Sequence, residues 1–144
     1  GGITKLENHM LEALKKKLEH DDKYAEITGV EIIEARPGYS KVCLPYKESI
    51  MNSVGVPHGG ALFTLADMAF STAANYGQER VMVSTNANIS FIKGAKRGPL
   101  VAEGKIINGG HRLATYSVEI FDGDGKCIAA AMISGYRLDT PLFP

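Results

Sequence analysis

The chain has 144 residues, enough for one domain with a hydrophobic core and too few to argue for two. Lysine plus arginine balance aspartate plus glutamate at 16 each, so no net charge favours binding to nucleic acid or an anionic membrane, and a small-molecule ligand is the better expectation. Cys43 and Cys127 lack C-x-x-C spacing, and no segment has the pattern of a signal peptide or membrane span. We therefore expect a cytoplasmic protein with reduced, structural thiols.

The first third of the chain predicts a helix and then a hairpin. Residues 3–20 carry apolar side chains at spacings of three and four with Lys and Glu between them, which predicts an amphipathic helix. The runs 24–34 and 39–46 are rich in β-branched and apolar residues, and Arg36-Pro37-Gly38 between them favours a turn. We expect two paired strands there, followed by loop up to Gly60.

A single long helix is predicted over residues 61–76. This stretch has no Lys, Arg, Glu or His, and apolar and small residues occupy all of its faces, as in a buried helix that Gly77 would cap. Its only carboxylate is Asp67, and burying an ionised carboxylate costs several kcal/mol, in order of magnitude, unless something compensates. Asp67 is therefore a candidate functional residue, the alternative being a structural group bonded to a backbone donor.

Four strands are predicted after the helix, over residues 81–92, 100–108, 112–121 and 126–138. In the first of them the odd positions are expected to face the core: Val81, Val83, Thr85, Ala87, Ile89 and Phe91. Asp122-Gly-Asp-Gly suits a hairpin turn better than a calcium loop, because Ile133 stands where a bidentate glutamate would be needed. The sum is a single α+β domain over residues 1–144, an antiparallel sheet of about six strands wrapped around the central helix, with residues 1–20 as an N-terminal helical extension.

The residues before the central helix predict an anion-stabilising turn. His58-Gly59-Gly60 places two glycines at the helix start, where free amides and the helix dipole can stabilise developing negative charge, as in an oxyanion hole. The alternative is a simple tight turn. Asp67 would lie about 10–12 Å along the helix from the Gly59 amide, too far for both groups to act on one carbonyl carbon. If both act on one substrate, each site is shared between two subunits of a homodimer.

These residues resemble a known family. Asn52, His58-Gly59-Gly60, Phe63, Ala66, Asp67 and Ala69-Phe70 are similar to the signature of the PaaI-like branch of hotdog-fold thioesterases, in the 4-hydroxybenzoyl-CoA thioesterase superfamily, and the resemblance extends over residues 24–138. It implies hydrolysis of an acyl- or aryl-CoA thioester by a homodimer or a tetramer of dimers, without a separate cofactor or metal. Coenzyme A is part of the substrate.

The resemblance also implies residue roles. Asp67 would be the general base or nucleophile, Gly59 the oxyanion-hole donor, and His58 and Asn52 would help to hold the thioester and the attacking water. Ser84 matches a position where some relatives orient the water with a hydroxyl, although strand alternation puts it on the less apolar face. His58 as a mere helix-start residue and Ser84 as a plain strand residue are the alternatives.

Substrate-binding candidates are more scattered. Lys93, Lys96 and Arg97 follow one strand and Arg112 lies in another connection; together they would contact the CoA phosphates, or simply form a solvated basic loop. Gly60, Phe63 and Asn88 complete the set of candidate substrate-binding residues. Two other functions are open: a hotdog hydratase or dehydratase acting on acyl thioesters, and a non-catalytic acyl-CoA-binding module.

Overall fold

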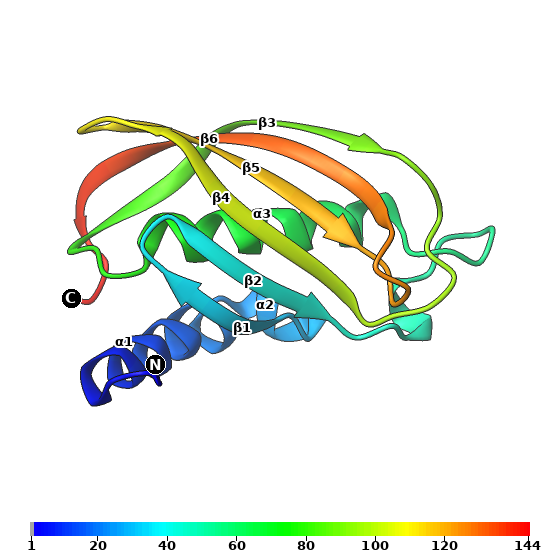
Figure 1. Ribbon diagram of the computed structural model, residues 1–144, viewed down its shortest axis with the longest axis horizontal. Helices are drawn as coiled ribbons and strands as arrows, with labels where there is room; N and C mark the ends of the chain where they lie inside the picture. The colour runs from blue at the N-terminus through cyan, green and yellow to red at the C-terminus, as the bar shows by residue number, and fades with distance from the viewer. Residues whose placement is uncertain (1) are drawn as a thin grey trace.

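A six-stranded antiparallel sheet curves around one long helix, α3 (Gly59–Asn75), in the computed structural model, which describes residues 2–144 (Figure 1). The sheet order is β1-β2-β4-β5-β6-β3. The strands are β1 (Glu31–Arg36), β2 (Tyr39–Leu44), β3 (Arg80–Phe91), β4 (Leu100–Gly109), β5 (Leu113–Phe121) and β6 (Cys127–Pro141), and a short 3-10 helix, η2 (Glu48–Ile50), precedes α3. The expected α+β arrangement around a central helix is confirmed.

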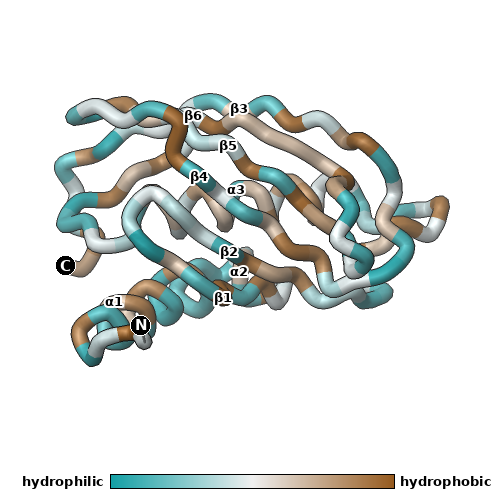
Figure 2. Tube along the Cα trace, in the orientation of Figure 1, coloured by the Kyte–Doolittle hydropathy of each residue, from teal (hydrophilic) through white to brown (hydrophobic). Residues whose placement is uncertain are grey.

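An N-terminal helical segment packs beside the sheet. It consists of α1 (Lys5–Lys15) and a π-helical turn, η1 (Lys16–Asp21), close to the predicted bounds. Hydrophilic and hydrophobic residues alternate along α1, as expected of a helix with one face against the body (Figure 2). The buried carboxylate of Glu19 accepts hydrogen bonds from the Ile32 amide at 2.7 Å and the Lys15 ammonium at 3.1 Å, which fastens this segment to β1.

The prediction of a strand from residue 24 was wrong for its first part. Residues 23–28 form helix α2 (Lys23–Thr28), and β1 begins only at Glu31. The Asp22 side chain caps the helix by accepting from the Ala25 amide at 3.0 Å, and Gly29 ends it at φ 80°, a conformation that favours glycine. These two end signals outweigh the apolar content of the run.

Helix α3 is buried against the concave face of the sheet, with one stripe left open. The Ser40 hydroxyl donates to the Ala69 carbonyl at 2.6 Å, and Gly104 permits this close approach because a Cβ there would lie 2.9 Å from the same carbonyl oxygen. The helix ends as expected, since Gly77 follows at φ 72°. The expectation that all faces are buried was wrong, because a stripe of residues is exposed or partly exposed in the single chain: Gly60, Phe63, Thr64, Asp67 and Ser71.

Strand β3 departs from the predicted alternation. Met82, at an even position, is its buried residue, whereas Val83 is 41% exposed. The register with β6 shifts between Ser84 and Asn86, so the strand changes which side chains it turns inward, and β3 is also the edge strand of the sheet. A bulge in an edge strand therefore explains why a strict two-residue period was the wrong expectation.

No helix within residues 2–144 is long and apolar enough to cross a membrane.

Candidate active site

Asp67 lies on the open stripe of α3 with its side chain partly buried. Burial raises the pKa of its carboxyl above the usual aspartate range, and the negative charge of Asp22 raises it further. The Ser84 side chain of β3 acts in the opposite direction and lowers this pKa. The environment thus favours a carboxyl that is a stronger base than a solvated aspartate.

The two residues that affect the Asp67 pKa, Asp22 and Ser84, come from different elements of the fold. Asp22 is the residue that caps α2, so the same carboxylate that starts a helix also acts electrostatically on Asp67. The sequence analysis did not identify Asp22 as a helix cap. Asp22 before the run and Gly29 after it are nevertheless typical start and end signals of a helix. Ser84 lies before the bulge in β3, two residues after the buried Met82 and therefore on the same side of the strand.

Asn75 fixes the start of β3 relative to α3. Its buried side chain accepts from the Met82 amide at 2.8 Å and donates to the Met82 carbonyl at 3.3 Å, and it also donates to the Ser71 carbonyl at 2.8 Å. These bonds join the last turn of α3 to the strand two residues before Ser84. Asn75 therefore acts as a positioning residue, and no pattern in the sequence distinguished it from other helix residues.

The start of α3 leaves one amide free. His58 precedes the helix, and its Nδ1 accepts from the Gly60 amide at 2.8 Å, while its carbonyl accepts from the Ala61 and Leu62 amides. Within residues 2–144 the Gly59 amide has no hydrogen-bond partner. Since Nδ1 is an acceptor, a neutral His58 carries its proton on Nε2 and can donate from there. The free Gly59 amide and the His58 Nε2–H are the donors that this turn offers.

A pocket of about 330 Å³ lies beside the Gly59 amide. Gly59, Asn52, Phe91 and Lys93 contribute to its lining. The Asn52 side-chain oxygen already accepts from the Val54 amide at 3.0 Å and the Val56 amide at 3.2 Å, so only its NH₂ group remains to bind a ligand. The structure therefore brings Asn52, Gly59 and Lys93 together, with Phe91 as an apolar wall that the sequence did not single out.

Asp67 does not line this pocket, and neither does Ser84. Asp67 follows Gly59 by eight residues on a regular helix, which separates them by about 12 Å along the axis. One chain thus presents a basic carboxyl with a hydroxyl in one place and a set of hydrogen-bond donors in another. Phe63, 40% exposed, lies one turn from Asp67 on the same stripe.

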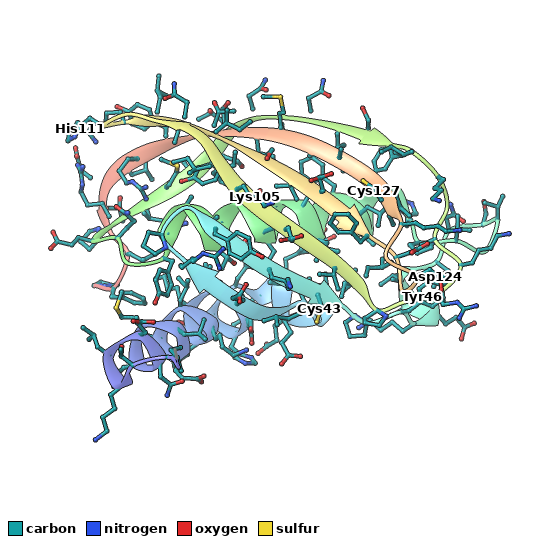
Figure 3. All side chains as sticks on the ribbon, viewed as in Figure 1. Cys43, Tyr46, Lys105, His111, Asp124 and Cys127 are labelled. Atoms are coloured by element: carbon teal, nitrogen blue, oxygen red, sulfur yellow. The ribbon has the colours of Figure 1, made fainter. Side chains whose placement is uncertain are left out.

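The other predicted binding residues are dispersed. Arg97 pairs with Asp124 at 3.4 Å on the surface, and Lys96 is exposed in the same loop. Arg112 pairs instead with Asp139 at 2.8 Å, beside the start of β3, so it lies away from the loop that follows the end of that strand. Figure 3 shows this separation, with His111 at one end of the molecule and Asp124 at the other.

Asn88 stands after the bulge and lies in a depression with Ser90, Ser117, Glu119 and Met132. Glu119 and Met132 are exposed, so this is the outer face of the sheet rather than the face toward α3. The structure does not bring Asn88 to Asp67 or to Gly59.

Asp122 forms a hairpin turn, since its side chain accepts from the Asp124 and Lys126 amides. Within residues 2–144 no three His, Cys, Asp or Glu side chains are grouped so that they could hold a metal ion, and Cys43 and Cys127 form no disulfide.

Comparison with known proteins defines the class. The sequence model of the Thioesterase superfamily matches residues 54–129, more than half of the chain. The chain therefore belongs to this superfamily. A putative esterase of Archaeoglobus fulgidus is 34% identical over 142 residues, which cover 98% of this chain and 92% of the relative.

The acyl-coenzyme A thioesterase PaaI of Escherichia coli is 29% identical over 119 residues, covering 82% of this chain and 84% of PaaI. The solved structure of the E. coli PaaI protein, from the phenylacetic acid degradation operon, matches with a TM-score of 0.84 and 26% identity, covering 92% of this chain and 96% of that one. The protein is thus a hotdog-fold member of the superfamily that is similar to PaaI.

Proposed function

We propose that the protein hydrolyses acyl-CoA or aryl-CoA thioesters to a free acid and coenzyme A. The observation that carries the proposal is the pair of groups on α3: a partly buried Asp67 with a raised pKa, and a Gly59 amide without a hydrogen-bond partner among the described residues. A base and an oxyanion donor are the two groups that thioester hydrolysis needs. The similarity to PaaI, an acyl-coenzyme A thioesterase, supports the same substrate class.

In the proposed reaction the Gly59 amide donates to the thioester oxygen, where negative charge develops, with the α3 dipole behind it. Asp67 takes a proton from a water molecule that Ser84 helps to orient, and the water attacks the carbonyl carbon. The C–S bond then breaks, and the proton goes to the leaving thiolate. Direct attack by Asp67, giving an acyl-enzyme anhydride that water hydrolyses, is the second route open to the same groups.

The donors around Gly59 serve the substrate. The His58 Nε2–H and the Asn52 NH₂ group are free to donate to the substrate. The acceptor atoms of the same side chains, His58 Nδ1 and Asn52 Oδ1, already accept backbone amides. Lys93 at the pocket, with Lys96 and Arg97 in the loop beyond it, would bind the phosphates of CoA through charge-assisted hydrogen bonds.

Each site would combine Asp67 of one subunit with the Gly59 turn of the other, because about 12 Å separates the two groups within a chain. An uncovered edge supports such a dimer: β3 is a 12-residue edge strand that carries exposed apolar side chains, Val83 and Phe91, the latter 55% exposed. The open α3 stripe with Phe63 and Asp67 lies beside it. Two dimers would then associate into the tetramer that the family resemblance implies.

Thiol release from a panel of acyl-CoAs of different chain length and aryl character tests the proposal, with wild type and the Asp67→Asn variant compared. We expect turnover by wild type and a loss of about 10²–10⁴-fold in kcat for the variant. Tight acyl-CoA binding without thiol release would instead indicate a binding module. Addition of water to an enoyl-CoA without thiol release would indicate a hydratase.

A further inference from the structure

A second cavity, of about 770 Å³, lies at the opposite end of α3 from the Gly59 amide. Its lining includes Ala73 from the last turns of the helix, Met82 from β3, Ile106 from β4 and Ala114 from β5. Of its polar side chains, Arg137 and Tyr116 are buried, Arg80 is partly exposed, and three are exposed to solvent: Gln78, Glu79 and His111. The cavity therefore combines apolar walls with a cation and a phenol.

Arg137 is a buried cation without a counter-ion. It is 9% exposed, and no carboxylate within residues 2–144 lies within 4.0 Å of its guanidinium. Among the described residues the guanidinium makes one hydrogen bond, from Nη1 to the Arg80 carbonyl at 3.1 Å, although it has five N–H donors. Burial lowers the pKa of Arg137, and the Arg80 charge lowers it too, while Tyr116 opposes this effect.

The neighbouring charges do not neutralise Arg137. Arg80 and Arg112 both pair with Asp139, at 3.0 and 2.8 Å, so one carboxylate already serves two guanidinium groups. Glu79, the carboxylate residue in the cavity wall, is exposed to solvent. No fully buried side-chain nitrogen or oxygen among the described residues lacks a hydrogen-bond partner, so the guanidinium nitrogens of Arg137 without a partner are accessible, and Arg137 lines the cavity. An anion that enters the cavity can accept hydrogen bonds from them and offset the charge.

Tyr116 offers a second donor at the same place. The residue is 3% exposed, its ring packs edge-on against Phe70 at 5.4 Å, and its hydroxyl forms no hydrogen bond with residues 2–144. Both side chains line the same cavity, and the Arg137 charge lowers the pKa of this hydroxyl against the larger, opposite effect of burial. A planar guanidinium and a phenol hydroxyl together match the two oxygens of a carboxylate.

We propose that this cavity binds a small monocarboxylate, with the carboxylate on Arg137 and Tyr116 and an apolar tail against Ala73, Met82 and Ala114. This site uses none of the residues assigned to thioester hydrolysis, so it stands or falls separately from that function.

Isothermal titration calorimetry with sodium hexanoate tests the proposal, and hexanamide, of the same shape without the charge, is the matched ligand. We expect hexanoate to bind wild type and the Asp67→Asn variant equally well, and hexanamide to bind at least about tenfold more weakly. Arg137→Gln should weaken hexanoate binding by about tenfold or more, and Tyr116→Phe by about threefold.

Because Arg137 is buried, its replacement can impair folding, and Tyr116→Phe keeps the packed ring while deleting the hydroxyl. In addition, the arginine Nε–H NMR signals of wild type should shift on hexanoate addition without any substitution. Three results would each overturn the proposal. The first is no binding of hexanoate, and the second is binding of hexanamide or inorganic phosphate as tight as that of hexanoate. The third is loss of hexanoate binding in Asp67→Asn while Arg137→Gln retains it.

Discussion

The Gly59 amide can be deleted with little other change to the backbone. Gly59 is the first residue of α3, where proline is well tolerated, and the preceding His58 has φ −64° and ψ 140°, the conformation that a following proline requires. Gly59→Pro therefore removes an N–H that has no partner in the part of the chain that the structure describes, and it costs no helix hydrogen bond. If this amide is the oxyanion donor, only the proposed reaction should suffer.

The expected loss follows from the donors that remain. Removing one oxyanion donor typically costs about 10²–10³-fold in kcat, or about 2.7–4 kcal/mol, and the His58 Nε2–H and Asn52 NH₂ group remain in Gly59→Pro, so a loss near 10²-fold is expected. Steady-state thiol release at saturating acyl-CoA measures it.

Gly59→Ala is the matched control. A Cβ at this position would meet the Phe91 ring at 3.2 Å, a contact that both variants share, but alanine retains the amide. We expect Gly59→Ala to keep kcat within about fivefold of wild type, because the ring needs to move only slightly. Equal activities of the proline and alanine variants would refute the role of the Gly59 amide.

Four further predictions concern the pKa of Asp67 and the packing of α3. Asp67 must be ionised to act as a base, so Asp22→Asn, which keeps the α2 cap but removes a charge that raises the Asp67 pKa, should move the acid limb of the pH profile of kcat/KM to lower pH. Ser84→Ala removes a group that lowers this pKa and should move the limb to higher pH; shifts in the same direction would contradict both assignments. The pKa of Asp67 is raised in the folded state, so ionised Asp67 destabilises the fold at pH values above its unfolded-state pKa. Asp67→Asn should therefore raise the free energy of unfolding at pH 7 by about 0.5–2 kcal/mol. This gain should shrink as the pH falls through the folded-state pKa and then the unfolded-state pKa of Asp67. Gly104→Ala should lower the free energy of unfolding in urea by about 1–3 kcal/mol, because its Cβ would press on the Ala69 carbonyl; an unchanged midpoint would mean that the helix does not approach β4 this closely.

Local patterns predicted much of the fold. The apolar run over 61–76 predicted the central helix and Gly77 its end. The last three strand runs, β4 to β6, pair with their neighbours in the chain, whereas β3 pairs with β6 and not with β4. Helix α2 was missed because its apolar residues favoured a strand, whereas the decisive signals were a cap at Asp22 and a left-handed Gly29. Element ends carried more information than the composition between them.

The site was predictable in its parts but not in its arrangement. The chemistry of Asp67 and Gly59 could be read from residue types and helix spacing. The bulge in β3, which follows Ser84 and changes which side chains face inward beyond it, has no signal in a two-residue period. The distance between Arg112 and Lys93 depends on which strands are neighbours. Arg137 likewise reads as an ordinary polar strand residue, since only the packing around it reveals a buried, unpaired charge.

Mixing two inactive variants tests the shared site most directly. In a dimer of Asp67→Ala subunits both sites lack the carboxyl, and in a dimer of Gly59→Pro subunits both sites lack the amide donor. After random subunit exchange at equal amounts, half of the dimers are hybrids, and each hybrid has one undamaged site out of two, so the mixture should regain about a quarter of the wild-type thiol release. If each chain holds a complete site, hybrids contain only damaged sites, and no recovery despite demonstrated exchange would contradict the account.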